Sequence, residues 1–369
     1  MKKTDSRPRK LPRGVRILIK TLLCVIAAVI LAAIIYVAYV LLSYSRIEDN
    51  QDLQIESNAS QQVLQTGQSY TIVTQNLGFG AYTADFTFFM DGGKLSRAVS
   101  AESVTDCITQ GAETAVSFEP DFVLFQEVDT DSTRSYHIDE SAILAQYFSD
   151  YDSVAAINYH SAYLMYPLLC PHGASNSEIM TFSRYALQSS VRRSLPVSTG
   201  LSKLLDLDRC YSVSRIACDN GHELVLYNTH MSAYGGSDAL RAAQMSMLFE
   251  DMYSEYQNGN YVVCGGDFNH DFTGTATVDL NGEAVDDFGW AQPFPAELLP
   301  KGLSRAMDYE ELVGSCRNCD VPYEEGNFVT IVDGFLVSDN ITVDSVKIID
   351  TGFVYSDHNP VVMQFTPQT

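Results

Sequence analysis

Lysine and arginine are scarce over most of this sequence. The 369 residues contain 23 Lys and Arg against 46 Asp and Glu, which gives a formal net charge of −23. Residues 1–46 hold nine of the basic residues and one acid, Asp5, so the remainder has 14 basic and 45 acidic residues, a balance of −31. Because proteins that bind nucleic acid neutralise its phosphates with Lys and Arg, this balance leaves nucleic acid as a disfavoured partner.

The sequence also has no internal repeat, and only 19% of its residues are charged. Hydrophobic residues make up 46% and aromatic residues 11%, which excludes a disordered chain, a collagen and a simple coiled coil. A basic start on an acidic remainder indicates two compartments rather than one soluble domain.

Charged residues are absent between Lys20 and Arg46, and residues 21–45 form an apolar run of 25 residues. A helix of this length can span a bilayer core with some tilt. A buried core helix rarely runs this long without a polar face, and a secretory signal has a shorter apolar region with a small-residue cleavage site, which VAYVLLSYS lacks. Eight basic residues precede the run, so the positive-inside rule predicts a single-pass cell-membrane anchor with a cytoplasmic N-terminus and the rest outside.

The chain divides into four predicted parts. Residues 46–69 are rich in Gln, Asn, Ser and acids without a sustained apolar period, which is typical of a polar linker. Residues 272–327 hold Gly, Pro, acids and the only tryptophan, Trp290, and predict an irregular insertion such as a lid. The parts are a basic cytoplasmic tail (1–20), a transmembrane anchor (21–45), a polar linker (46–69) and an outer domain (70–369) with the insertion 272–327.

Short apolar runs in the outer domain predict buried strands, because they are rich in Val, Ile, Phe and Tyr and are bounded by Gly, Asn, Asp or Pro. Arg97–Phe118 and Asp238–Tyr256 predict helices, and Ser237 is a good N-cap for the second. Strands mixed with helices, some strands in direct succession, predict an α/β fold of packed sheets flanked by helices. The predicted strands are Tyr70–Gln75, Asp121–Gln126, Glu223–Thr229, Tyr261–Gly265, Val329–Val337 and Pro360–Phe365.

Polar residues that can bind metal or phosphate recur at the ends of these predicted strands. A strand interior is buried, whereas its end opens onto a face where loops can form a site. Asp333 lies inside a predicted strand, where a carboxylate is costly to bury without a partner. One such residue alone is usually a turn or surface residue, but a series of them in one order predicts a shared site. The series is Asn76, Glu127, His230, Asp267, Asn269, Asp333, Asp357 and His358.

Six segments contain these residues. They are QNLG (75–78), FQEVD (125–129), NTH (228–230), GDFN (266–269), VDGFLVS (332–338) and SDHNPV (356–361). In this order they resemble the endonuclease/exonuclease/phosphatase superfamily, which includes pancreatic-type deoxyribonucleases, abasic-site endonucleases, neutral sphingomyelinases and inositol polyphosphate 5-phosphatases. GDFN and SDH together are specific, and the resemblance covers essentially the whole outer domain. It implies a four-layer sandwich, α+β in arrangement, with two β-sheets packed face to face and helices outside.

The resemblance implies a divalent metal, usually Mg²⁺, with Mn²⁺ or Ca²⁺ as alternatives. Asn76 and Glu127 match the positions that hold it, and Asp357 matches a further acidic position on the metal side. Mg²⁺ prefers oxygen ligands and keeps several waters, so these side chains suffice. Zinc, the rival metal, favours Cys and His at close spacing; Cys316 and Cys319 have half of such a spacing, with no second CxxC or HxxxH beside them.

The same resemblance implies the catalytic roles. His358 matches the general base and Asp333 the carboxylate that orients it. His230 matches a histidine that contacts the phosphate. Asp267 and Asn269 match the pair beside the attacking water and the leaving oxygen.

One segment departs from the pattern of the superfamily. Many relatives have a Ser-Arg-Tyr-Pro-like segment where this chain has SRYA at 183–186, and Arg184 is a candidate contact to the phosphate. The seven cysteines of the outer domain leave at least one unpaired, and Cys210 with Cys218 could close a hairpin. The CxxC pair at 316–319 could be a disulfide, free thiols or a redox pair.

These expectations combine into a membrane-anchored, extracellular, metal-dependent phosphoesterase. It would hydrolyse a phosphodiester or phosphomonoester by metal- and His-assisted attack of water, with the phosphoester and the membrane as its partners. The alternatives are an extracellular endonuclease or exonuclease, and a non-catalytic anchored binding module. The complete set of Glu127, Asp267 and His358 favours the enzyme, because a pure binding module has no reason to keep all three.

Overall fold

The chain folds into two compact units, residues 1–45 and residues 46–369. In the first unit, helix α1 (Arg13–Ser43) has 31 residues and is long and apolar enough to cross a membrane. At 1.5 Å per residue it measures about 46 Å, more than the ~30 Å of a bilayer core. The computed structural model describes residues 12–198, 208–232, 237–273, 280, 290–308 and 311–369.

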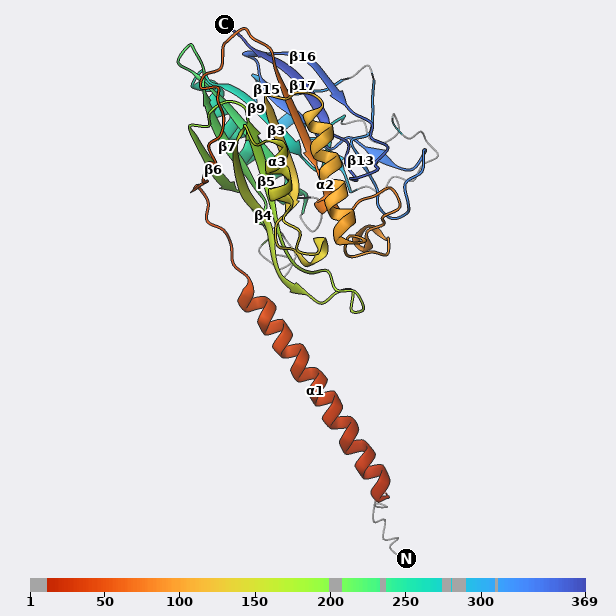
Figure 1. Cartoon of the computed structure of the whole chain (residues 1–369). Coiled ribbons are helices and arrows are strands. Elements are labelled where there is room, and N and C mark those ends of the chain that lie inside the picture. Colours follow the sequence, from red (N-terminus) through yellow and green to blue (C-terminus); the bar gives the residue numbers. More distant parts are fainter. Residues whose placement is uncertain (1–11, 199–207, 233–236, 274–279, 281–289, 309–310) are drawn as a thin grey trace, which may run out of the picture. The chain divides into compact units, whose positions relative to one another are not determined.

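The second unit contains two mixed β-sheets with helices on their outer faces, which confirms the predicted sandwich (Figure 1). In each sheet one neighbouring pair of strands is parallel, β2 with β3 and β8 with β9, and the other pairs are antiparallel. The seven-stranded sheet has the order β1 (Gln51–Asp52), β6 (Ser189–Ser194), β7 (Cys210–Ala217), β8 (Glu223–His230), β9 (Tyr261–Asp267), β15 (Asp333–Ser338) and β12 (Leu303–Ala306). The six-stranded sheet has the order β16 (Ile341–Ile348), β17 (Val361–Pro367), β2 (Tyr70–Asn76), β3 (Phe122–Asp129), β5 (Gly173–Ser183) and β4 (Asp152–Leu164).

Successive side chains of a strand point to opposite faces of its sheet and so contribute to two different cores. Ile72 points into the core between the sheets, where it packs in one cluster with Leu226 from β8. Its neighbour Val73 points the other way, into a cluster with Ile108 of α2. Because successive side chains of a strand lie on opposite faces, a continuous apolar run is buried on both sides.

Within the described residues, three α-helices cover the sheets. α2 (Ala101–Val116) and α3 (Glu140–Tyr147) pack on the six-stranded sheet, and α4 (Asp238–Gln257) packs on the seven-stranded sheet. Ser237 caps α4 as predicted, because its side chain accepts a hydrogen bond from the backbone N–H of Leu240. Short 3₁₀ turns lie at η1 (Gly78–Gly80), η2 (Phe89–Asp91), η3 (Thr133–Ser135) and η5 (Ala296–Leu298).

The predicted polar linker, residues 46–69, packs against the domain instead. Strand β1 pairs with β6, and the N–H of Leu53 donates to the carbonyl of Ser190 at 2.9 Å. Leu64 is fully buried between the sheets. The apolar residues of this segment are few and irregularly spaced, so they show no period in the sequence, although each is anchored in the folded unit that begins at Arg46.

The predicted strand Val329–Val337 is broken. β14 (Val329–Thr330) pairs with β13 (Cys316–Arg317) in a small separate sheet, and β15 begins only at Asp333. The break places Asp333 at a strand start rather than inside a strand. The predicted insertion 272–327 is partly regular, since β12 joins the large sheet; residues 274–279, 281–289 and 309–310 lie outside the described residues. A second small sheet joins β10 (His270–Asp271) to β11 (Gln292–Pro293).

A buried polar contact joins the two large sheets below the site. The Gln126 amide on β3 donates to the Asn228 side-chain carbonyl on β8 at 2.8 Å. The Asn228 amide in turn donates to the backbone carbonyl of Met180 on β5 at 2.8 Å. These two buried hydrogen bonds link the register of one sheet to that of the other.

All eight cysteines, each within the described part of the chain, are free, so neither the hairpin disulfide nor a bridge between Cys316 and Cys319 is formed.

Candidate active site

The candidate site lies where two pairs of parallel strands end. Asn76 is the last residue of β2 and lies opposite Gln126 on β3, and His230 lies opposite Asp267 at the ends of β8 and β9. The carboxyl ends of parallel strands meet at one edge of a sheet, so each sheet brings two of the predicted residues together.

Asn76 links the residues of the two sheets. Its side-chain amide lies 3.4 Å from Oε1 of Glu127 on β3 and donates to Oδ2 of Asp267 on β9 at 3.1 Å. Its side-chain carbonyl accepts the N–H of Gly78 at 2.9 Å. Asn76 is buried, whereas the Glu127 side chain keeps 24% of its surface exposed, and so Glu127 faces the opening of the site.

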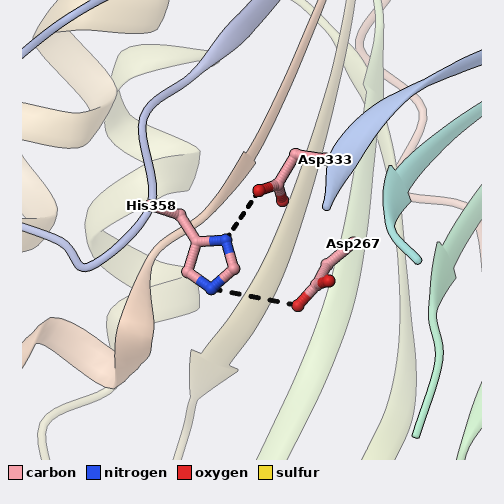
Figure 2. A group of neighbouring side chains, drawn as sticks. All are labelled: Asp267, Asp333 and His358. Carbon is pink, nitrogen blue, oxygen red and sulfur yellow. Dashed lines mark hydrogen bonds and ion pairs between the residues drawn. The ribbon is translucent and has the colours of Figure 1, made fainter. Parts of the chain in front are cut away.

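His358 and Asp333 form a hydrogen-bonded pair (Figure 2). Nδ1 of His358 donates to Oδ2 of Asp333 at 2.7 Å, and the Ser315 hydroxyl donates to the same oxygen at 2.7 Å. The Ser315 hydroxyl also accepts the N–H groups of Val332 and Asp333, at 2.9 and 3.0 Å. This arrangement fixes the ring orientation and leaves Nε2 toward the site.

Asp267 lies opposite the hydrogen-bonded pair of Asp333 and His358. Its Oδ2 is 3.9 Å from Nε2 of His358 and 3.3 Å from Nε2 of His230. The Asn269 side-chain amide donates to the same oxygen at 3.2 Å, and the Asn269 N–H donates to Oδ1 at 2.9 Å. The structure therefore brings His230, Asp267, Asn269, Asp333 and His358 together.

Burial and crowded charges shift the pKa values of the site. Burial, followed by repulsion from Asp333, raises the pKa of Asp267 to about 7, and burial raises the pKa of Asp357 to about 6. Burial lowers the pKa of His230 well below its ordinary value. Burial also opposes protonation of His358, but the adjacent Asp333 carboxylate outweighs it and raises the pKa of His358 well above its ordinary value.

The donor set fits a divalent cation. Oδ1 of Asp357 is buried and has no hydrogen-bond partner within the described residues. A Cβ on Gly78 would lie 2.7 Å from this oxygen, so only a glycine leaves room here, and the N–H of the same glycine binds Asn76. Asp357 and Asn76 thus flank Gly78. The negative charge of Glu127 contributes to the raised pKa of Asp357, after the larger effect of burial. A cation held here would relieve the cost of burying these carboxylates and oppose protonation of His358.

A second group of side chains also has the spacing of a metal site. One ligand atom each from Asp267, Asp333 and His358 lies within 4.8 Å of the others. However, the hydrogen bond between Asp333 and His358 already occupies two of these groups (Figure 2). The Ser315 hydroxyl also donates to Asp333. This group can therefore serve proton transfer, and Asn76, Glu127 and Asp357 are the residues that could hold a cation.

Arg184, the predicted phosphate contact, lies elsewhere. It follows Ser183, which pairs with Phe122 at the first residue of β3, whereas Glu127 lies near the last residue of that strand. Its guanidinium donates to the Tyr151 hydroxyl at 2.7 and 3.2 Å. The prediction is wrong because β5 runs antiparallel to β3, which carries this segment to the opposite end of the sheet.

Arg134 lies at the site and was not predicted. Its guanidinium makes two 2.9 Å hydrogen bonds to Asp129, stacks 3.8 Å above the Phe79 ring, and lies 3.9 Å from Oε2 of Glu127. Asp129 lies at the end of β3 and Arg134 lies five residues later in a 3₁₀ turn. This spacing is not typical of any motif, so the sequence does not predict their contact. These contacts place the Arg134 guanidinium beside the Glu127 carboxylate.

Cys316 also lies at the site. Its sulfur is 3.4 Å from Nε2 of His358. Burial raises the pKa of Cys316 to about 12, so the thiol keeps its proton and lies within hydrogen-bonding distance of the ring nitrogen. The sequence offered Cys316 only as half of a CxxC pair, whereas its contact is with His358, 42 residues away.

Gly266 is required by the close approach of β9 to β8. It has φ +147°, and a Cβ there would lie 2.0 Å from the carbonyl oxygen of Thr229. We expect Gly266→Ala to destabilise the fold by about 3 kcal/mol or more, because backbone cannot yield as a flexible side chain does. Gly221→Ala is the control, since that glycine also has positive φ (+86°) but has no atom within 4 Å. Urea unfolding of the two variants measures the difference; equal losses would mean that the contact with Thr229 is unimportant.

The comparisons with known proteins agree with this architecture. The model of the Endonuclease/Exonuclease/phosphatase family matches residues 73–358, and the chain belongs to this family. Its members are phosphoesterases and nucleases, and some solved members have the same fold as this chain. The comparison with curated proteins finds no match.

Three solved structures illustrate the shared fold. An endonuclease/exonuclease/phosphatase from Beutenbergia cavernae DSM 12333 has 16% identity over 81% of this chain and 72% of that chain, with a TM-score of 0.53. D. rerio TDP2 complexed with single strand DNA product has 14% identity over 81% of this chain and 99% of that chain, with a TM-score of 0.51. ANGEL2, a 2′,3′-cyclic phosphatase, has 13% identity over 88% of this chain and 100% of that chain, with a TM-score of 0.50. At these identities the likeness extends to the fold alone.

Proposed function

We propose that the chain is a membrane-anchored phosphoesterase that requires a divalent metal and works outside the cell. The observation that carries the proposal is the Asp333–His358 pair facing Asp267 at 3.9 Å, beside Asn76 and Glu127. A buried pair of this geometry can move a proton, and the acidic group next to it can hold a cation. The membership of the family supports a hydrolase in general, and the site supports hydrolysis by water.

His358 is the general base in this proposal. Nε2 takes the proton of the attacking water, while Asp333 holds Nδ1–H and stabilises the imidazolium that forms. Asp267 and Asn269 orient the water and the leaving oxygen. His230, which its low pKa keeps neutral, donates a hydrogen bond to the phosphate.

Asn76, Glu127 and Asp357 would hold the cation, with Mg²⁺ the first candidate because all three offer oxygen atoms. When bound, the cation stabilises the negative charge that develops on the phosphate. Arg134 keeps Glu127 in place for this role through its contacts with Asp129 and Phe79.

A nuclease is the alternative with support in the comparisons, because TDP2 was solved with a single-stranded DNA product. The balance of −31 over residues 47–369 opposes it, since the field of such a domain repels a polyanion. A non-catalytic binding module has less support, because it does not explain a hydrogen-bonded Asp–His pair aimed at a third acid.

The full chain, purified in lipid nanodiscs, tests the proposal. We expect it to hydrolyse bis-(p-nitrophenyl) phosphate with Mg²⁺, to lose activity with EDTA and to regain it when Mg²⁺ is restored. Plasmid DNA and sphingomyelin are assayed in parallel. Much faster cleavage of DNA than of the other two would favour the nuclease, and no release from any substrate with any divalent metal would favour the binding module.

A further inference from the structure

The β4–β5 hairpin exposes apolar side chains at its tip. β4 ends at Leu164 and β5 begins at Gly173, and the hairpin extends beyond the neighbouring strands of its sheet (Figure 1). Leu169 is fully exposed, Leu168 is 79% exposed and Tyr166 is 69% exposed. Water-exposed leucines in succession are costly, so such a tip is typical of a surface that contacts an apolar partner.

The part of the hairpin between Asp152 and Glu178 lacks side chains of Asp, Glu, Lys or Arg. None occurs in the 25 residues between Asp152 and Glu178, although the domain is strongly acidic elsewhere. The nearest basic residues of the adjoining segment are Lys94, which is exposed, and Arg97, which donates to the carbonyl of Pro171 at 2.5 Å. An apolar tip with tyrosines and nearby cations fits the boundary between the headgroups and acyl chains of a bilayer.

β4 is linked through Asp208 to Arg46, which lies three residues after the end of the apolar helix. Nε of Arg46 lies 3.0 Å from Oδ1 of Asp208, and Oδ2 of Asp208 lies 2.9 Å from Nδ1 of His160 on β4. α1 ends at Ser43, so at most about 10 Å of chain separates its end from Arg46. From His160, Leu164 is about 13 Å further along the strand. A membrane crossed by α1 is therefore within reach of the tip.

The hairpin also adjoins the candidate active site. The N–H of Ala174, at the start of β5, donates to the Thr133 hydroxyl at 3.1 Å. Thr133 precedes Arg134, which lies 3.9 Å from Glu127. The tip and Glu127 thus belong to the same end of the six-stranded sheet, since Asp129 at the end of β3 pairs with Ser177 of β5.

We propose that the tip at residues 163–170 inserts into the surface of the bilayer and holds the active site against it. The substrate is then a phosphodiester carried by a membrane lipid. The proposal rests on the function proposed above, including α1 as a membrane anchor, and it adds the docking element and the substrate class. A bilayer is favoured over a second copy of the chain because the tip carries no charge for pairing, and because the strand that leads to it is linked through Asp208 to Arg46.

Depth measurements test the insertion without reference to activity. Leu169→Cys is made in the full chain with the two exposed cysteines removed (Cys24→Ser and Cys170→Ser), and is labelled with an environment-sensitive fluorophore in phosphatidylcholine nanodiscs. Doxyl-labelled phosphatidylcholine is expected to quench this probe at least about twofold more than a probe at Val116→Cys. Val116 is a matched control because it ends α2, at the opposite end of the domain, and is also exposed (38%). Equal quenching of the two probes overturns the insertion, as does a spectral shift that depends on protein concentration and not on lipid.

Turnover of lipid then tests the substrate class. The double variant Leu168→Asp/Leu169→Asp is expected to lose about tenfold or more of its activity on phosphatidylcholine and sphingomyelin vesicles, and to keep its activity on bis-(p-nitrophenyl) phosphate. Val116→Asp is the matched control. An equal loss on both kinds of substrate overturns the docking role. A wild-type chain that is quenched in the depth measurement but hydrolyses no ester at all would refute the proposed function and leave the insertion standing.

Discussion

His358→Ala is expected to lower turnover of bis-(p-nitrophenyl) phosphate by about 10²–10⁴-fold, with the fold intact. The variant removes the atom proposed to take the proton from water. Asp333 keeps the hydrogen bond that its carboxylate accepts from the Ser315 hydroxyl and the one that its own N–H donates to that hydroxyl. Rates at saturating Mg²⁺, together with circular dichroism and thermal unfolding, separate a loss of chemistry from a loss of structure.

His222→Ala is the matched control for this variant, because His222 is an exposed histidine in the turn between β7 and β8. It is expected to keep wild-type turnover. A His358→Ala variant with a near-wild-type rate would remove the proposed mechanism, whatever the behaviour of the control.

Glu127→Gln is expected to raise the Mg²⁺ concentration needed for half-maximal activity by at least ~10–100-fold, the range found when even an outer partner of a metal ligand is removed. The substitution keeps size and shape but removes the charge that would hold the cation. It leaves Arg134 bound to Asp129, so the surrounding structure is preserved. Mg²⁺ titration of the rate and direct calorimetry of Mg²⁺ binding both measure the effect.

Glu250→Gln, on an exposed position of α4, is the control for the loss of one negative charge. If both variants gave the wild-type Mg²⁺ dependence, Glu127 would not be a ligand and the assignment of the cation to Asn76, Glu127 and Asp357 would be wrong.

The sequence predicted the buried centre of the fold better than its edges. The strands at Tyr70 and Tyr261 are apolar on both faces because each sheet has a core on either side, and such runs are conspicuous. β4 was not predicted, since its Ser, Ala and Asn residues give no apolar run, although its pairing with β5 is extensive. The sequence of residues 46–69 resembles a linker because its few apolar residues are buried only by partners far away in the chain.

The residues of the candidate site also differ in how well the sequence predicts them. Residues at the ends of apolar strands, such as Asn76 and Asp267, could be found from position and family resemblance. Arg184 was misplaced because the direction of β5 relative to β3 cannot be read from one segment. Arg134 and Ser315 were missed because their roles arise from contacts made only in the folded chain.

The hydrogen bond between Gln126 and Asn228 has a consequence for how this chain can vary. It lies in the interior and ties together the two halves that carry the reactive groups, so the spacing of those groups depends on the buried framework and not on the connecting loops. Hairpin tips and turns can therefore exchange sequence, and with it the choice of molecule presented to the pocket, while the bond-breaking step stays the same. Substrate specificity can therefore change through the surface loops, whereas substitutions in the buried framework are expected to abolish the reaction.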